Sequence, residues 1–202
     1  MTFIIAELGV NFRNLNEADE MIREAAAAGA NACKFQCYKP DMVDGNPRRR
    51  ELIDIILDES AIRYLYWRCL EAGVEFLCTP MYVEAVDMLD PYVKRWKIRY
   101  IDRDNEELVR KCVLTGKPML ISGKNIFCIP EYPPGIPQPI PDNAEYIGIS
   151  HHFPKVTGLD LTGWTYFEVH VKRDHYPDNY CPIDNAVSIT MSELAELCRR
   201  VK

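Results

Sequence analysis

Apolar residues along this chain gather into eight short runs, and the segments between the early runs follow a different pattern. The runs are FIIAEL (3–8), ACKFQCY (32–38), EFLCT (75–79), RWKIRYI (95–101), KPMLIS (117–122), NIFCI (125–129), EYIGIS (145–150) and TYFEVHV (165–171). Most are apolar on both faces instead of alternating cleanly. That pattern is typical of parallel strands that are covered on one side and packed on each other on the other side. We therefore predict eight parallel strands.

The segments between the early strands carry helical patterns. Asn16 can cap a helix over 16–30, which has an acidic first turn and an exit at Gly29. Further helices are predicted over 59–72, from about 83, over 104–116 and over 192–201. Alternation of strand and helix is the βαβ signature, and eight strands make a closed (β/α)8 barrel the leading fold.

The second half departs from this scheme. Only Gly123 and Lys124 separate the fifth run from the sixth, and the six prolines of segment 129–143 exclude a helix there. A crossover between parallel strands normally needs a dozen residues or more. We therefore expect an α/β fold that is a trimmed TIM (β/α)8 barrel, with some outer helices missing in the second half and one domain over 1–202. An open sheet is the alternative.

Composition narrows the class of protein. The net charge of −6 and a pI near 5.3 argue against a nucleic-acid or anionic-membrane partner, and 48% hydrophobic residues are ordinary for a globular chain. The opening MTFIIAELGVN is too short and too acidic for a signal peptide, and no later run approaches the ~18 apolar residues of a membrane span. None of the eight cysteines forms a C-x-x-C pair. We expect a cytoplasmic protein without disulfides.

Functional groups fall at the carboxyl ends of nearly all the predicted strands, where barrel enzymes keep their catalytic residues. They are Glu7, Lys34 with Gln36, Thr79, Lys97 with Asp102, Ser122, Ser150 with His152, and His170. All four histidines lie within residues 151–175. Each residue taken alone could be a strand end that meets solvent. Together they predict a site, and the histidines belong either to a solvated loop or to a metal centre.

Nine motifs in order resemble the barrel domain of the sialic acid (N-acetylneuraminate) synthase family. They are IIAELGVN, KFQCYKP, FLCTP, WKIRYID, TGKPMLIS, EYPP, GISHH, FEVHV and DNAVSITMSEL, and the likeness runs from Ile4 to about Arg200. The resemblance implies condensation of phosphoenolpyruvate with an N-acylated amino sugar such as N-acetylmannosamine. It also implies a divalent metal, with Mn²⁺ expected and Mg²⁺ or Co²⁺ as alternatives. The C-terminal antifreeze-like domain of the family does not occur in this sequence.

The resemblance assigns the metal and catalytic residues. Ser150-His151-His152 is similar to the Ser-Asp-His of the family, which makes His152 a metal ligand and puts His151 in place of the aspartate. Glu168-Val169-His170 is similar to its Glu-Lys-His, which makes His170 the second ligand. Glu7 matches the acid that reaches the metal through water. The alternative is that His151 and His152 are loop residues and His170 is a core histidine.

The resemblance also implies how the substrates are held. Phosphoenolpyruvate, a carboxylate and a phosphate, needs cations and hydroxyl donors, and the matching residues are Lys34, Lys97, Thr79, Ser122 and Ser150. Gln36, Asp102 and Asp184 match residues that contact the sugar. Lysines snorkelling from a barrel rim, and solvated or turn-forming polar residues, are the alternatives.

The departures from the family pattern leave other functions open. Tyr100 replaces a phosphate-binding serine, Phe127-Cys128 replaces His-Cys, and Ser122-Gly123 shortens a Ser-Thr-Gly. The absent domain supplies an arginine to the sugar site of a partner subunit in the family. A homo-oligomer, or a partner subunit that carries this domain, is therefore an open expectation. The other readings are a condensing enzyme with a different aldose, and a catalytically degraded barrel that binds a ligand or a partner.

Overall fold

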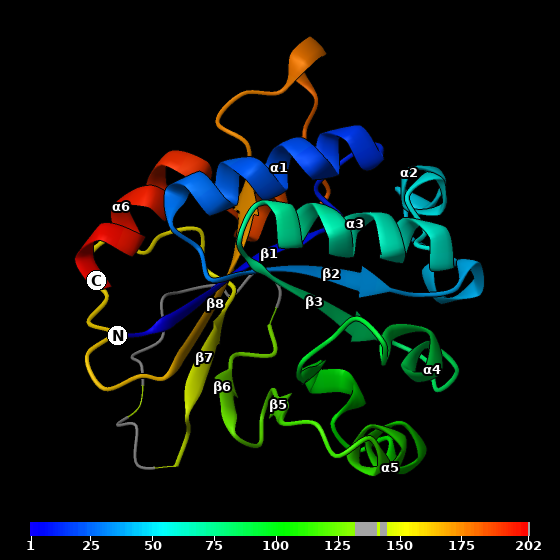
Figure 1. Ribbon diagram of the computed structural model, residues 1–202. Helices are drawn as coiled ribbons and strands as arrows, with labels where there is room; N and C mark the ends of the chain where they lie inside the picture. Colours follow the sequence, from blue (N-terminus) through cyan, green and yellow to red (C-terminus); the bar gives the residue numbers. More distant parts are fainter. Residues whose placement is uncertain (132–140, 142–144, 202) are drawn as a thin grey trace.

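A computed structural model describes residues 1–131, 141 and 145–201, and it shows a curled parallel sheet with helices on its outer face (Figure 1). Motif residues 132–134 of EYPP, and most of the proline-rich segment, lie outside the described residues. The strands are β1 (Phe3–Gly9), β2 (Ala32–Cys37), β3 (Glu75–Pro80), β4 (Trp96–Ile98), β5 (Met119–Ile121), β6 (Ile126–Cys128), β7 (Gly148–His151), β8 (Tyr166–Lys172) and the short β9 (Ile189–Thr190).

The strands follow one another in chain order around a barrel. One parallel ladder has the order β3-β2-β1-β8-β7-β6, with β9 beside β8, and a second ladder pairs β4 with β5. β4 packs beside β3, and a single parallel bridge from Ser122 to Ile126 joins the end of β5 to β6. The predicted trimmed (β/α)8 barrel is therefore confirmed, and its two seams lie at β3/β4 and β5/β6.

Helices cover the first half of this barrel and thin out in the second. The α-helices are α1 (Leu15–Ala28), α2 (Arg49–Asp54), α3 (Glu59–Glu71), α4 (Ala85–Leu89), α5 (Glu106–Leu114) and α6 (Met191–Val201). Short 3₁₀ turns are η1 (Pro40–Val43), η2 (Tyr100–Asp102), η3 (Pro177–Asn179) and η4 (Asn185–Val187). Figure 1 shows α6, α1 and α3 side by side outside the sheet, and α1 contacts both of the others. In the described residues, no helix lies between β5 and β6 or between β7 and β8.

Two apolar layers hold the barrel together. The larger one lies between the sheet and the helices and includes Phe12, Leu65, Trp96 and Phe167. The smaller one fills the barrel interior and consists of Ile5, Ala32, Leu77, Leu120 and Ile126. Because each strand packs against helices on one face and against other strands on the other, its residues are apolar on both faces, as the sequence predicts.

Local details differ from the predicted elements. Asn14, and not Asn16, caps α1, because its side chain accepts a hydrogen bond from the backbone N–H of Glu17 at 3.0 Å. The predicted strand over 95–101 stops at Ile98, and η2 follows it. No pattern in the sequence predicts α2 or β9. None of the helices in the described part of the chain is long and apolar enough to cross a membrane.

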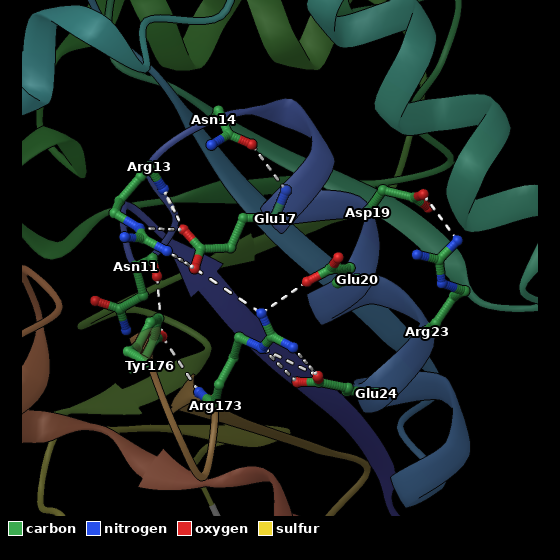
Figure 2. A network of polar contacts seen from close by, with 10 residues as sticks. All are labelled: Asn11, Arg13, Asn14, Glu17, Asp19, Glu20, Arg23, Glu24, Arg173 and Tyr176. Atoms are coloured by element: carbon green, nitrogen blue, oxygen red, sulfur yellow. Dashed lines mark hydrogen bonds and ion pairs between the residues drawn. The ribbon is translucent and has the colours of Figure 1, made fainter. Parts of the chain in front are cut away.

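An arginine directly after β8 fastens the end of the barrel to its first helix (Figure 2). Arg173 contacts Glu20 and Glu24 of α1 at 2.7 Å each. Arg13 forms a two-pronged pair with Glu17 at 3.0 Å, and Glu17 lies 3.9 Å from Arg173. Tyr176 adds a hydrogen bond from its hydroxyl to the backbone oxygen of Asn11 at 3.0 Å. These contacts link segments at opposite ends of the chain.

Replacing Arg173 with Met is expected to lower the free energy of unfolding by about 1 to 2 kcal/mol, because a partly buried guanidinium with several carboxylate partners contributes more than a lone surface pair. The matched control is Arg23→Met. Arg23 forms one i,i+4 pair with Asp19, and its side chain is 54% exposed against 21% for Arg173. The control should stay within about 0.5 kcal/mol of wild type in urea unfolding. Equal losses in the two variants would contradict the linking role of Arg173.

Candidate functional site

A cavity of about 400 Å³ opens at the carboxyl ends of the strands. Ten of the eleven site residues predicted from the sequence line it: Glu7, Lys34, Gln36, Thr79, Lys97, Ser122, Ser150, His152, His170 and Asp184. The eleventh, Asp102, lies beside the cavity without lining it, and its carboxylate accepts a hydrogen bond from Arg99 Nε at 2.5 Å. His151 does not line the cavity either, since its ring packs on Phe167 on the outer side of β7.

The alternation of the strands places these polar groups in one layer. Each residue of the inner apolar layer is followed two positions later by a residue that lines the cavity, so that Ile5 leads to Glu7 and Ala32 leads to Lys34. Register completes the layer, because Glu7 is the ladder partner of Lys34 on one side and of His170 on the other. The apolar layer therefore forms the floor of the cavity.

Buried charges of opposite sign meet on this floor. Lys34 forms an ion pair with Glu7 and lies 3.8 Å from Glu168, while Lys97 reaches across the barrel to within 3.2 Å of Glu168. Hydroxyl groups complete the cluster. Ser150 donates to Glu168 at 2.8 Å, and Lys97 donates to Ser122 at 2.8 Å. Lys34 also donates to Thr79 at 3.3 Å. Ion pairs that are this deeply buried are costly to break.

The cluster shifts the protonation of its members. Burial alone would raise the pKa of Glu168, but the two ammonium groups of Lys34 and Lys97 outweigh it and lower this pKa to about 2. Burial lowers the pKa of Lys34 to about 8, against the opposing pull of Glu168. Glu168 is therefore a carboxylate at neutral pH, and Lys34 titrates much closer to neutrality than an ordinary lysine.

Two imidazoles face each other on the wall formed by β7 and β8. The ring centroids of His152 and His170 are 5.3 Å apart. Nδ1 of His152 lies 3.2 Å from the backbone oxygen of Ile129, and Nδ1 of His170 lies 3.1 Å from Asp184 Oδ2. Burial, and next the neighbouring His170, lower the pKa of His152 to about 4. A neutral imidazole whose Nδ1–H donates to an oxygen carries its lone pair on Nε2, which is the arrangement of a metal-ligating histidine.

These two histidines suit a divalent ion only as part of a ligand set completed by other oxygen atoms. Within the described residues, no group of three or more His, Cys, Asp or Glu side chains is placed to hold a metal. The oxygen next to His170 belongs to Asp184, a second-sphere partner of the kind that orients metal-ligating histidines. The donor set therefore fits a site with two imidazole ligands, in which water or substrate fills the remaining positions.

Asp184 is held in place by residues near the end of β1. Its backbone N–H donates to Asn11 Oδ1 at 2.7 Å, and Asn11 Nδ2 in turn donates to the backbone oxygen of Val171 at 2.8 Å. Gly9 leaves room beside it, because a Cβ atom at Gly9 would lie 2.7 Å from Glu7 Oε1 and 3.3 Å from Asp184 Oδ2. With φ at +50°, Gly9 also has a backbone conformation that favours glycine.

Sequence reasoning missed two charged residues of the site. The motif around Glu168 assigns it no role, although its spacing from His170 already puts both side chains on the same face of one strand. No sequence pattern points to Arg99, yet it lines the cavity, and so do Tyr100 and Ile101. In a strand over 95–101, consecutive side chains would alternate between the two faces of the sheet. The chain turns after Ile98 instead and brings three consecutive residues to the rim of the cavity.

Comparisons with known proteins identify the family of this chain. A family model described as the NeuB family matches residues 21–124, just over half of the chain. N,N'-diacetyllegionaminic acid synthase of Legionella pneumophila is 31% identical over an alignment of 138 residues, and the match covers 59% of this chain and 39% of that protein. The enzyme of the same name from Campylobacter jejuni is 29% identical over 60% of this chain and 42% of its own length. The matches thus span about two fifths of each curated relative.

Solved structures show the same fold. The crystal structure of N-acetylneuraminic acid (sialic acid) synthetase from Leptospira borgpetersenii in complex with citrate has a TM-score of 0.73 at 23% identity, and the match covers 98% of this chain and 81% of that one. A truncated 3-deoxy-D-arabino-heptulosonate 7-phosphate synthase from Thermotoga maritima has a TM-score of 0.65 at 14% identity, covering 99% and 85%. At these identities the likeness is one of fold alone.

Replacing Glu168 with Gln is expected to lower the free energy of unfolding by about 3 kcal/mol at pH 7, because two buried ammonium groups lose their shared counter-charge. Adding Lys97→Met should recover part of this loss, and a double-mutant cycle in urea measures the coupling. The folded-state pKa of Glu168 lies below its unfolded value. Its contribution should therefore be complete above about pH 5 and vanish as the pH falls towards 2. A difference between wild type and Glu168→Gln that persists at pH 2 would contradict this account.

Proposed function

This chain belongs to the NeuB family, and on that premise we propose that it condenses phosphoenolpyruvate with an N-acylated amino sugar aldose of the N-acetylmannosamine kind. The products are a nonulosonic acid of the sialic acid type and inorganic phosphate. The observation that carries the proposal is one cavity that is lined by two buried lysines, three hydroxyl groups and a pair of imidazoles. The first set suits an anion with a carboxylate and a phosphate, and the second suits a metal that binds a carbonyl oxygen.

The lysines and hydroxyls are the groups that hold phosphoenolpyruvate. An ammonium has three donors, so Lys34 and Lys97 can keep their carboxylate partners and still donate to a substrate oxygen. Thr79, Ser122 and Ser150 each lie within hydrogen-bond distance of this cluster. Glu7 and Glu168 balance the two ammonium groups before the substrate arrives. A trianionic ligand is then held by directed donors more than by net charge.

His152 and His170 are the residues that would hold the metal, and Glu7 lies beside them as the ladder partner of His170. When bound there, Mn²⁺, or Mg²⁺ or Co²⁺ in its place, would polarise the aldehyde of the open-chain sugar and make its carbon electrophilic. Asp184 orients His170 by its contact at Nδ1. Gln36 donates to Glu7 at 3.5 Å and stands beside it at the cavity wall, within reach of the hydroxyl groups of a sugar.

The chemistry balances without any further reactant. C3 of phosphoenolpyruvate forms a bond to the aldehyde carbon, and the aldehyde oxygen takes up a proton. Water adds at C2, and the bond between C2 and the bridging oxygen breaks, so that the phosphate leaves with that oxygen. Glu7 is the proposed positioner or proton acceptor of this water, since it is fully buried next to Lys34 and His170. The chain accelerates the reaction mainly by holding the reactants in place and by stabilising charge.

A second candidate is condensation of phosphoenolpyruvate with a different aldose. Tyr100 is the observation that favours it, because its ring lines the cavity and lies against Gly123, where a Cβ atom would come within 2.6 Å of the ring. A large side chain at this wall changes the space for substrates. Phe127, the other aromatic departure, packs on Tyr146 at 5.5 Å between ring centroids and does not line the cavity.

Incubation with Mn²⁺, phosphoenolpyruvate and N-acetylmannosamine should release inorganic phosphate and form a nonulosonic acid. A phosphate assay measures the first product, and mass spectrometry identifies the second. His170→Ala should lower kcat by about 100-fold or more, because it removes one of the two proposed metal ligands. The matched control is His151→Ala, a neighbouring histidine that does not line the cavity, and it should retain wild-type activity. If a panel of other aldoses also gives no product, the proposed function is wrong.

Binding of phosphoenolpyruvate should weaken as the pH rises through about 8, by roughly tenfold per pH unit above that point. The reason is that the pKa of Lys34 lies near 8 and only its protonated form donates to the anion. Calorimetric titrations between pH 6.5 and 9.5 measure the effect. Lys34→Met should bind weakly at every pH, with a flat profile. A wild-type affinity that does not change across this range would contradict the role of Lys34.

A further inference from the structure

One cation of the cavity is bound differently from the other two. The carboxylate partners of Lys34 and Lys97, Glu7 and Glu168, themselves line the cavity. Arg99 also lines the cavity, but its partner Asp102 does not. In the part of the chain that the structure describes, Arg99 pairs with Asp102, and it is the Nε–H group of Arg99 that donates to the carboxylate. With Nε engaged outside, the terminal nitrogens of the guanidinium are the ones that can meet a ligand in the cavity.

The position of Arg99 places it above a cluster of anion-binding groups. It follows Lys97 by two residues at the end of β4, one step nearer the mouth of the cavity. The neighbouring strand β5 leads to Ser122, whose hydroxyl accepts a hydrogen bond from Lys97 at 2.8 Å. The side chain of Arg99 is 35% exposed, and the next rim residue, Ile101, is 79% exposed. Arg99 can therefore reach a ligand from the entrance while its Nε atom stays bonded to Asp102.

The cavity is polarised by this arrangement. Lys97, Arg99 and Ser122 stand on the wall formed by β4 and β5. The wall formed by β8 and β1 holds the carboxylate of Glu7 and the pair formed by His170 and Asp184. A phosphate dianion is attracted more strongly to the first wall, where the carboxylate partner of Arg99 lies outside the cavity, than to the second, where Glu7 is already paired with Lys34. An acceptor that must reach the imidazoles belongs at the second wall.

We infer that Arg99 anchors the phosphate group of phosphoenolpyruvate at the entrance of the cavity, through its terminal nitrogens, while Lys97 and Ser122 bind the same end of the substrate from below. The inference rests on the proposed function for the identity of the ligand. A guanidinium presents two parallel donors that match a pair of phosphate oxygens, which an ammonium cannot do. Asp102 acts through Arg99 as a positioning residue. This explains how it serves the site without lining it.

The test compares four proteins by calorimetric titration at pH 7: wild type, Arg99→Gln, Arg99→Lys and Arg103→Gln. Arg103 is the matched control, because it stacks on Tyr100 at 3.7 Å and pairs with Asp104 but does not line the cavity. The probes are phosphoenolpyruvate, inorganic phosphate, pyruvate as a ligand without phosphate, and N-acetylmannosamine 6-phosphate as a phosphorylated acceptor. Binding is measured without turnover, so that the result does not depend on catalysis.

Arg99→Gln should lower the affinity for phosphoenolpyruvate and for inorganic phosphate by about 10- to 100-fold. Its affinity for pyruvate should stay within about threefold of wild type. Arg99→Lys should fall in between, and Arg103→Gln should match wild type. The inference is overturned if wild type binds neither phosphoenolpyruvate nor phosphate, or if Arg99→Gln weakens pyruvate as much as phosphoenolpyruvate. It is also overturned if only the phosphorylated acceptor loses affinity. If the affinities change as expected but no aldose gives product, the proposed function falls while the phosphate anchor stands.

Discussion

Buried charge is the constraint on which the rest of this molecule depends. Lys34 and Lys97 lie on the floor of a cavity inside a barrel, and taking an ammonium out of water costs several kcal/mol unless a counter-charge is near. Glu7 and Glu168 supply it, and each of the four comes from a different strand. The cluster is therefore stable only when β1, β2, β4 and β8 are all in register. The cations of the anion-binding site are therefore stable only in the closed barrel, which brings their counter-charges to them.

The chain builds this cluster by a simple alternation. An inner apolar layer, from Ile5 to Ile126, fills the barrel below, and the polar layer follows two residues later on each strand. The floor excludes water from beneath, which strengthens the electrostatic interactions above it. Helices are thin on the second half of the barrel, yet the site remains continuous there. The reason is that β7 and β8 are still paired to the main sheet and carry Ser150, His152 and His170 to its edge.

Much of this architecture can be predicted from the sequence, because it depends on patterns that single segments carry. Runs that are apolar on both faces predict parallel strands, the short gap at Gly123 predicts a missing helix, and strand ends predict nine residues of the cavity. What depends on contacts between segments is not predictable in this way. The register that sets Glu7 between Lys34 and His170 is one example. The preference for Asn14 over Asn16 as the cap of α1 is another, because both are asparagines and both suit the position.

The sequence also predicts that Asp102 contacts the substrate directly. The turn after Ile98 puts Arg99 between Asp102 and the cavity instead.

The pairing of β1 with β8 has a consequence for how the molecule is made. These strands lie far apart in the sequence, since β1 ends at Gly9 and β8 begins at Tyr166. A polypeptide emerging from the ribosome can join β1 to β2 and β3 early, but the other edge of β1 stays open until residues 166–172 have been synthesised. Long-range pairing of this kind slows folding, and an open strand edge invites association with other chains. Glu7 can therefore meet His170 only after all the residues between them have been synthesised, and nascent chains depend on prompt closure of this edge to escape aggregation.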